Sequence, residues 1–286
     1  AGFRLDVADE LPDEFIEKIR TAVKRVGPEK FLLGEVWEDA TNKFAYGQRR
    51  KYLLGEELDS VMNYPFADAV LDFVRFANGD SFFNSVMSIV ENYPPQVLSV
   101  LMNHIGTHDT VRAITRLAGE NPDGHDRTWQ FEHNTLSKFD YLRGVSMMKI
   151  ASLIQFTLPG VPSIYYGDEI GMQGMKDPFN RGCMAWDDVN DELLKWYKRL
   201  GQIRHSSKAF INGDFEKVYC DGGVIAYSRN CESDSVLLAI NNSNESKKIF
   251  VGTQWDNSYS LFDEICADGF ITLPPYRYTL HFTFNI

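Results

Sequence analysis

Long apolar runs are absent from this sequence. None of its 286 residues lies in an uninterrupted apolar stretch of the roughly 18 residues that a membrane-spanning helix requires. The longest candidate, residues 145–158, contains Lys149 and Gln155, and we interpret it as a buried helix. Positive charge is also scarce, since 29 Lys and Arg oppose 40 Asp and Glu and the net charge is -11. This balance argues against nucleic acid and against an anionic membrane as partners.

Cysteine is rare as well, with four residues and no spacing typical of a metal site. We expect reduced, mostly structural thiols. Cys220 and Cys231 flank a predicted hairpin and could face each other, but nothing in the sequence requires it. The residues predict no metal site. No secretory signal is recognisable, and a cytoplasmic location is expected. Because the sequence starts at Ala1 and not at Met, export is left open.

Aromatic residues are abundant, at 13%, whereas the hydrophobic share of 44% and the charged share of 24% are ordinary for a globular protein. Aromatic side chains mainly fill cores, but they also form the flat surfaces on which sugar rings stack. The length fits one large domain, or a domain and a half.

Strands and helices alternate over residues 1–206, which predicts an α/β fold with a parallel sheet. The segment 119–133 is polar and irregular, and we interpret it as a loop. The predicted strands are 3–7, 31–37, 58–64, 99–103 and 160–169, and the main predicted helices are 12–26, 65–76, 81–93, 137–157 and 192–204.

The pattern changes near residue 206. Asp221-Gly222 between two apolar segments predicts a β-hairpin. Residues 276–284 alternate between large apolar and polar side chains, which is typical of a strand. We therefore predict a second domain, a small antiparallel β-domain, over residues 207–286.

Three predicted strands end in acids: Asp6, Glu35 and, after a short polar run, Asp109. Arg4 lies two residues before Asp6, on the same face of the strand, and an arginine there keeps a carboxylate ionised. Glu35 lies between an apolar run and Trp37, a setting that favours a proton donor. Asp6 and Glu35 are about 30 residues apart, one βαβ unit, so they can lie at matching ends of neighbouring strands.

One ionised carboxylate beside one proton-donating carboxyl is the arrangement that retaining glycoside hydrolysis requires, with the two groups about 5–5.5 Å apart. Each acid taken alone is more simply explained as a solvated strand end. The three together, with Arg4 and His108 beside them, favour catalysis.

These segments resemble the α-amylase family of glycoside hydrolases, family 13. Gly2-Phe3-Arg4-Leu5-Asp6 is similar to its fourth-strand motif and Gly34-Glu35-Val36-Trp37 to its fifth. Residues 103–110 resemble the seventh-strand motif and residues 160–171 the eighth, while 177–186 resemble the following loop, except that Gly182-Cys183 replace a common arginine or proline. Within the family the chain looks most like the neopullulanase, cyclomaltodextrinase and maltogenic amylase subgroup.

The resemblance implies a role for each candidate. Asp6 would be the nucleophile, Glu35 the general acid/base and Asp109 the residue that stabilises the transition state. Arg4, His108 and Glu10 would contribute to substrate binding. Trp37 would form a platform for the sugar, with core packing as its alternative. Asp168 would line the pocket or make structural hydrogen bonds, and Arg181 would anchor its loop.

The implied substrates are starch-derived α-glucans: maltooligosaccharides, cyclodextrins and pullulan. The alternatives are a glucanotransferase or sucrose-acting member of the family, or a non-catalytic carbohydrate-binding fragment. The resemblance also implies a partial TIM (β/α)8 barrel, strands four to eight, in 1–206, followed by a β-sandwich domain in 207–286. We expect a piece of a longer enzyme, inactive or nearly so by itself, since five strands do not close an eight-stranded barrel. Calcium is possible in the full-length enzyme, and the open strand edge makes a homodimer plausible.

Overall fold

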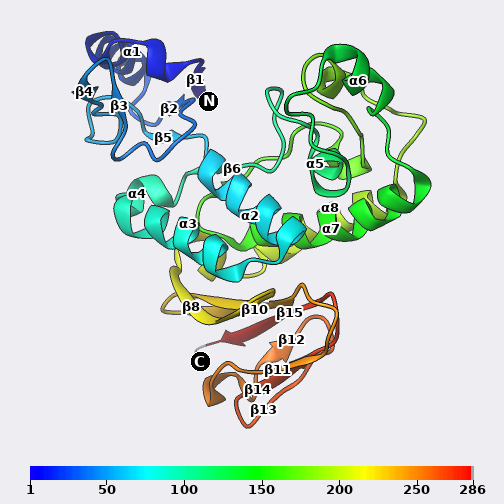
Figure 1. Ribbon diagram of the computed structural model, residues 1–286. Helices are drawn as coiled ribbons and strands as arrows, with labels where there is room; N and C mark the ends of the chain where they lie inside the picture. The colour runs from blue at the N-terminus through cyan, green and yellow to red at the C-terminus, as the bar shows by residue number, and fades with distance from the viewer. Residues whose placement is uncertain (285–286) are drawn as a thin grey trace.

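The computed structural model describes residues 1–284. It contains a helix-rich α/β part and a β-domain beneath it, drawn yellow to red in Figure 1. The five predicted parallel strands are present and follow one another in sequence order. Strands β1 (Gly2–Leu5), β2 (Phe31–Gly34) and β5 (Ser60–Val61) form one parallel sheet, and β6 (Met102–Asn103) pairs with β7 (Val161–Pro162).

A single parallel bridge between Met62 and Met102 joins these two sheets into one arc. Within residues 1–284, β1 and β7 each pair with one strand only, so the arc is not closed. The fold is therefore a partial barrel of strands followed by a β-domain, as the sequence predicted.

The strands are shorter than predicted, for local reasons. Residues predicted to begin the fourth strand instead complete the turn after α4 (Pro95–Leu98), where the backbone N–H of Ser99 donates to the carbonyl of Pro95 at 3.0 Å. The fifth ends at Pro162, and its predicted acidic end instead forms the 3-10 helix η2 (Asp168–Ile170), which follows Gly167 with its positive φ of 88°.

Most of the helices begin at a polar side chain. Asn63, Asn78, Ser137 and Asn190 each accept a hydrogen bond from the first turn of the helix that follows. Besides α4 and the helix α6 described below, the helices are α1 (Asp13–Val26), α2 (Tyr64–Phe76), α3 (Gly79–Asn92), α5 (Ala113–Ala118), α7 (Lys138–Thr157), α8 (Asp191–His205) and α9 (Ala209–Asn212).

One prediction about the loops was wrong. The segment 119–133 contains a helix, α6 (Arg127–Glu132), which Asp126 caps by accepting from the N–H of Trp129. Its polar composition concealed it, because α6 is a surface helix with little buried side chain. The sequence also did not predict the hairpin of β3 (Phe44–Ala45) and β4 (Gln48–Arg49), which follows β2.

The β-domain has two layers. A five-stranded antiparallel sheet contains β8 (Asp214–Asp221), β9 (Val224–Asn230), β10 (Asp234–Asn241), β15 (Arg277–Phe284) and β12 (Tyr259–Ser260). The second sheet contains β11 (Lys247–Phe250), β14 (Phe270–Leu273) and β13 (Cys266–Ala267). The predicted hairpin at Asp221-Gly222 is confirmed. All four cysteines are free, so Cys220 and Cys231 are not bonded to each other.

The five-stranded sheet is buried on both faces. One face packs on the helices of the barrel part, and the two parts share one hydrophobic cluster that includes Phe82, Phe210 and Tyr227. The other face packs on the second sheet around Leu237 and Trp255. For this reason the alternation in β15 does not produce an exposed polar face. Two of its polar residues, Thr279 and His281, are buried as well. No helix within residues 1–284 is long and apolar enough to cross a membrane.

Candidate active site

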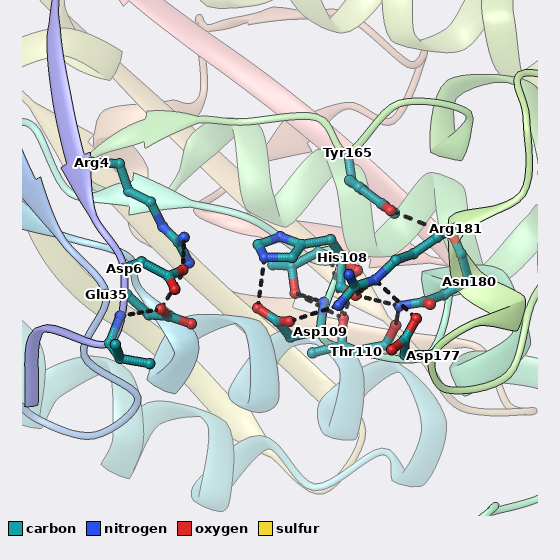
Figure 2. Close-up of polar contacts among 12 residues, drawn as sticks. Arg4, Asp6, Glu35, His108, Asp109, Thr110, Tyr165, Asp177, Asn180 and Arg181 are labelled. Carbon is teal, nitrogen blue, oxygen red and sulfur yellow. Dashed lines mark hydrogen bonds and ion pairs between the residues drawn. The ribbon is translucent and has the colours of Figure 1, made fainter. Parts of the chain in front are cut away.

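Asp6 and Glu35 are brought together by the pairing of β1 with β2. Leu5 is opposite Gly34 in the parallel register, so the two acids leave their strands at the same end. Arg4 contacts both: Nη1 donates to Oδ1 of Asp6, and Nη2 lies 3.0 Å from Oε2 of Glu35 (Figure 2). One cation therefore holds two carboxyl groups that start from separate strands.

The two acids differ in their surroundings. The Asp6 side chain is 71% exposed, whereas that of Glu35 is 5% exposed. Oε2 of Glu35 also accepts from the backbone N–H of Val7 at 2.7 Å, and Oε1 accepts from Nε1 of Trp37 at 3.2 Å. The apolar setting expected for Glu35 is therefore only partly present, because its oxygens are hydrogen-bonded although the side chain is buried. An open carboxylate beside an enclosed one suits an attacking group beside a proton carrier.

The third acid lies in a separate group after β6. Nε2 of His108 lies 3.0 Å from Oδ2 of Asp109, and Nη2 of Arg181 lies 3.2 Å from Oδ1 (Figure 2). Arg181 also donates through Nε to the carbonyl of His108 at 2.9 Å, so it anchors the loop and contacts Asp109 as well. Buried Asn180 donates to the carbonyls of His108 and Thr110 at 2.8 and 2.7 Å. This role of Asn180 was not predictable from the sequence, because its partners lie about 70 residues earlier in the chain.

Trp37 combines the two alternatives considered for it. Its ring stacks on that of Tyr64, with centroids 4.1 Å apart and an interplanar angle of 11°, and Tyr64 in turn meets His104 edge-on. The side chain nevertheless remains 45% exposed. It is packed on one side and accessible in part, and its N–H orients Glu35.

Glu10 lies four residues after Asp6, at the end of a 3-10 helix. Its carboxylate accepts from the hydroxyl of Tyr46, in the hairpin after β2. The two side chains line an open cavity of about 400 Å³, together with residues of segments 11–14 and 45–50. Tyr46 was not predicted as a site residue. The sequence signal that could have indicated it is the Tyr46-Gly47 pair, an aromatic residue in a turn.

Asp168 is not at the surface of the site. It is 2% exposed, and its Oδ1 lies 3.3 Å from Nη1 of Arg112, whose guanidinium lies over the rings of Tyr165 and Tyr166. Burial raises the pKa of Asp168 to about 7. This position does not support the predicted direct contact with substrate. It agrees with the structural alternative, because the pair ties the loop after β6 to the loop after β7.

No group of three or more His, Cys, Asp or Glu side chains that could hold a metal ion occurs within residues 1–284. Calcium sites also use main-chain and amide carbonyl oxygens, so calcium binding by the full-length enzyme stays a prediction.

The alpha amylase catalytic domain family matches residues 1–196, which include both groups of acids, and the alpha-amylase C-terminal domain family matches residues 213–258. The chain belongs to the α-amylase family. Curated relatives include a cyclomaltodextrinase of Thermoanaerobacter pseudethanolicus, 35% identical over 87% of this chain and 38% of the relative. A cyclomaltodextrinase of Geobacillus thermopakistaniensis is 34% identical over 98% and 44%, and neopullulanase 2 of Thermoactinomyces vulgaris is 31% identical over 87% and 38%.

Solved structures of the family share the architecture. A cyclomaltodextrinase superposes with a TM-score of 0.79 at 29% identity, covering 99% of this chain and 45% of the other. The debranching enzyme of Nostoc punctiforme superposes with a TM-score of 0.80 at 24% identity, which concerns the fold alone. The chain spans less than half the length of the two cyclomaltodextrinases and of the neopullulanase. The names of these relatives agree with the subgroup that the motifs indicated.

Proposed function

We propose that this chain carries the catalytic acids of a retaining hydrolase for α-glucosidic bonds in starch-derived glucans: maltooligosaccharides, cyclodextrins and pullulan. The observation that carries the proposal is the contact of Arg4 with both Asp6 and Glu35, one exposed and one buried. The names of the relatives, cyclomaltodextrinase and neopullulanase, support the substrate class.

In the proposed mechanism, Asp6 attacks the anomeric carbon while Glu35 gives its proton to the leaving glycosidic oxygen. The bond to that oxygen breaks and a covalent β-glucosyl ester on Asp6 forms. Glu35, now ionised, takes a proton from water, and the hydroxide replaces Asp6 with net retention of the α configuration. Asp109, oriented by His108 and Arg181, accepts hydrogen bonds from ring hydroxyls as the sugar distorts.

We further propose that the 286-residue chain alone cleaves maltooligosaccharides slowly or not at all. Its edge strands are open, with Phe3 of β1 and Val161 of β7 both exposed. A site at one end of such an arc lacks the rigid support that holds catalytic groups within about 0.5 Å. Turnover of maltotriose at a rate ordinary for enzymes, with kcat above about 1 s⁻¹, would contradict this part.

The roles of the acids can be tested with α-maltotriosyl fluoride, because fluoride leaves without a proton from Glu35. We expect slow fluoride release, loss of that release in Asp6→Asn, and an α-configured first product by NMR. Glu35→Gln should keep the fluoride burst but lose any residual slow cleavage of maltotriose. A β-configured product, or full activity in Asp6→Asn, would refute the assignment. No release combined with retained maltotriose binding by NMR would favour the non-catalytic carbohydrate-binding alternative, and longer products would favour transfer to sugars.

A further inference from the structure

Val7, the residue after the proposed nucleophile, has a strained backbone. Its φ of 42° and ψ of 50° lie in the left-handed region, which a β-branched residue rarely adopts. In this conformation its N–H donates to Oε2 of Glu35 at 2.7 Å. A conformation of this kind persists only where the surroundings hold it.

The turn after Val7 is held by Arg50, directly after β4. Nη1 of Arg50 donates to the carbonyl of Asp9 at 2.8 Å, and Nη2 donates to the carbonyl of Leu11. The N–H of Glu10 donates back to the carbonyl of Val7 at 2.9 Å. Arg50 therefore fixes the backbone of the short helix η1 (Ala8–Glu10) and of the residue after it, and this turn closes on Val7.

Each of the three guanidinium nitrogens of Arg50 donates a hydrogen bond, and the side chain is buried. Arg50 is 6% exposed, its Nε donates to Oδ1 of Asp13 at 2.6 Å, and it lies over the ring of Tyr52. Other groups hold the same turn by a side chain: the hydroxyl of Tyr52 and Nζ of Lys43 both contact the carboxylate of Asp9. Among these contacts Arg50 alone holds two main-chain carbonyls.

We propose that Arg50 is a positioning residue: it keeps Val7 in its strained conformation and thereby keeps the Val7 N–H on Glu35. The loop after β1 and the segment after β2 are thus one unit. The physical link stands independently of the activity, while its catalytic consequence rests on the function proposed above. A lysine cannot replace Arg50, because a single ammonium does not reproduce the planar fork that bonds two carbonyls and a carboxylate.

The link can be read without turnover, from the amide resonance of Val7 in protein labelled with 15N-valine. In a chain that keeps Arg50, Glu35→Gln should shift this resonance, since the substitution replaces the atom that accepts from the Val7 N–H. In Arg50→Gln and in Arg50→Lys the Glu35→Gln shift should be lost. Arg49→Gln is the matched control. Arg49 is exposed, and its Nη2 donates to the carbonyl of Thr41 at 2.9 Å, away from the turn after Val7, so the shift should persist.

A second comparison separates this role from simple loss of stability. Asp13→Asn weakens the ion pair of Arg50 but leaves both carbonyl contacts, so the Glu35→Gln shift should remain. On a fluorescently labelled maltooligosaccharide, whose leaving group needs a proton from Glu35, Arg50→Lys should lower kcat about tenfold and leave KM within about twofold. Persistence of the Val7 shift in both folded Arg50 variants would overturn the proposal. Loss of the Val7 link with no fluoride release in any variant would instead count against the proposed function alone.

Discussion

The indole N–H of Trp37 donates to Oε1 of Glu35 at 3.2 Å while the indole ring stacks on Tyr64. The stacking contact thereby fixes the ring of Trp37, and the ring N–H points toward the proposed acid/base. Both oxygens of Glu35 are therefore engaged, because Arg4 and the Val7 N–H contact its other oxygen. The stacking and the hydrogen bond can be separated by one substitution.

Trp37→Phe keeps an aromatic ring on Tyr64 and removes the donor. We expect cleavage of a fluorescently labelled maltooligosaccharide, whose leaving group needs a proton, to fall about tenfold, since a hydrogen bond to a charged group contributes about 1.5–3 kcal/mol. Fluoride release from α-maltotriosyl fluoride should change less than about twofold. Trp186→Phe, at an exposed tryptophan, serves as control and should affect neither rate. Equal losses on both substrates would show that Trp37 does not act through Glu35.

Glu57 predicts a pH dependence of stability. Its side chain is fully buried, and neither carboxylate oxygen has a hydrogen-bond partner. Burial raises its pKa to about 7, Asp13 and Glu17 add to the shift, and Arg50 and Lys51 oppose it. Because the folded-state pKa lies above the unfolded value near 4.5, the folded state holds the extra proton. The stability that this group contributes is complete below pH 4.5 and is lost as the pH rises through 7.

Glu57→Gln removes the titration while keeping the shape. We expect the variant to match the parent at pH 5 and to exceed it at pH 8 by on the order of 2 kcal/mol in free energy of unfolding. Urea unfolding at the two pH values measures this difference. Glu56→Gln, at the exposed neighbour, should give the same small effect at both. A Glu57→Gln chain that is less stable at pH 8 would show that the carboxylate has an ionic partner in solution.

The candidate acids were predictable because each depends on local sequence. A short apolar run that ends in Asp6 or Glu35 predicts a strand with an acid at its carboxyl end, and the spacing of one βαβ unit aligns the two. What the sequence did not contain is which distant side chains hold them. Asn180 and Arg50 act on carbonyl groups about 70 and 40 residues away, and any polar residue at those positions would look the same in the sequence.

For Asp168 the sequence left two alternatives open, and tertiary packing favours the structural one. Its place after a strand resembled that of Asp6, yet it is buried against Arg112. The difference arises from packing: a Cβ on Gly106 would lie 2.3 Å from its Oδ2, so the loop after β6 passes directly over it. Only the tertiary structure shows that contact.

Val7→Gly tests the strain in the turn. Glycine adopts the left-handed region freely, so the substitution removes an unfavourable conformation of on the order of 1–3 kcal/mol and costs at most about 1 kcal/mol of chain entropy. The valine side chain is half exposed and loses little packing. The free energy of unfolding should therefore stay constant or rise by about 1 kcal/mol. Val26→Gly, at an exposed valine at the end of α1, should lower it instead. If both variants lose stability equally, Val7 is not strained in solution.

The hydroxyls of Tyr227 and Thr157 lie 2.6 Å apart and join β9 to the last turn of α7. Both side chains are buried, and Tyr227 belongs to the hydrophobic cluster that the two parts of the chain share, so the barrel part and the β-domain should unfold in one transition. Tyr227→Phe leaves Thr157 its bond to the carbonyl of Leu153 and should cost about 1 kcal/mol. Calorimetry should show a single peak moved to lower temperature, and Tyr259→Phe, at an exposed tyrosine of the β-domain, should not move it. Two peaks, of which Tyr227→Phe moves only one, would mean that the shared cluster does not couple the β-domain to the barrel helices.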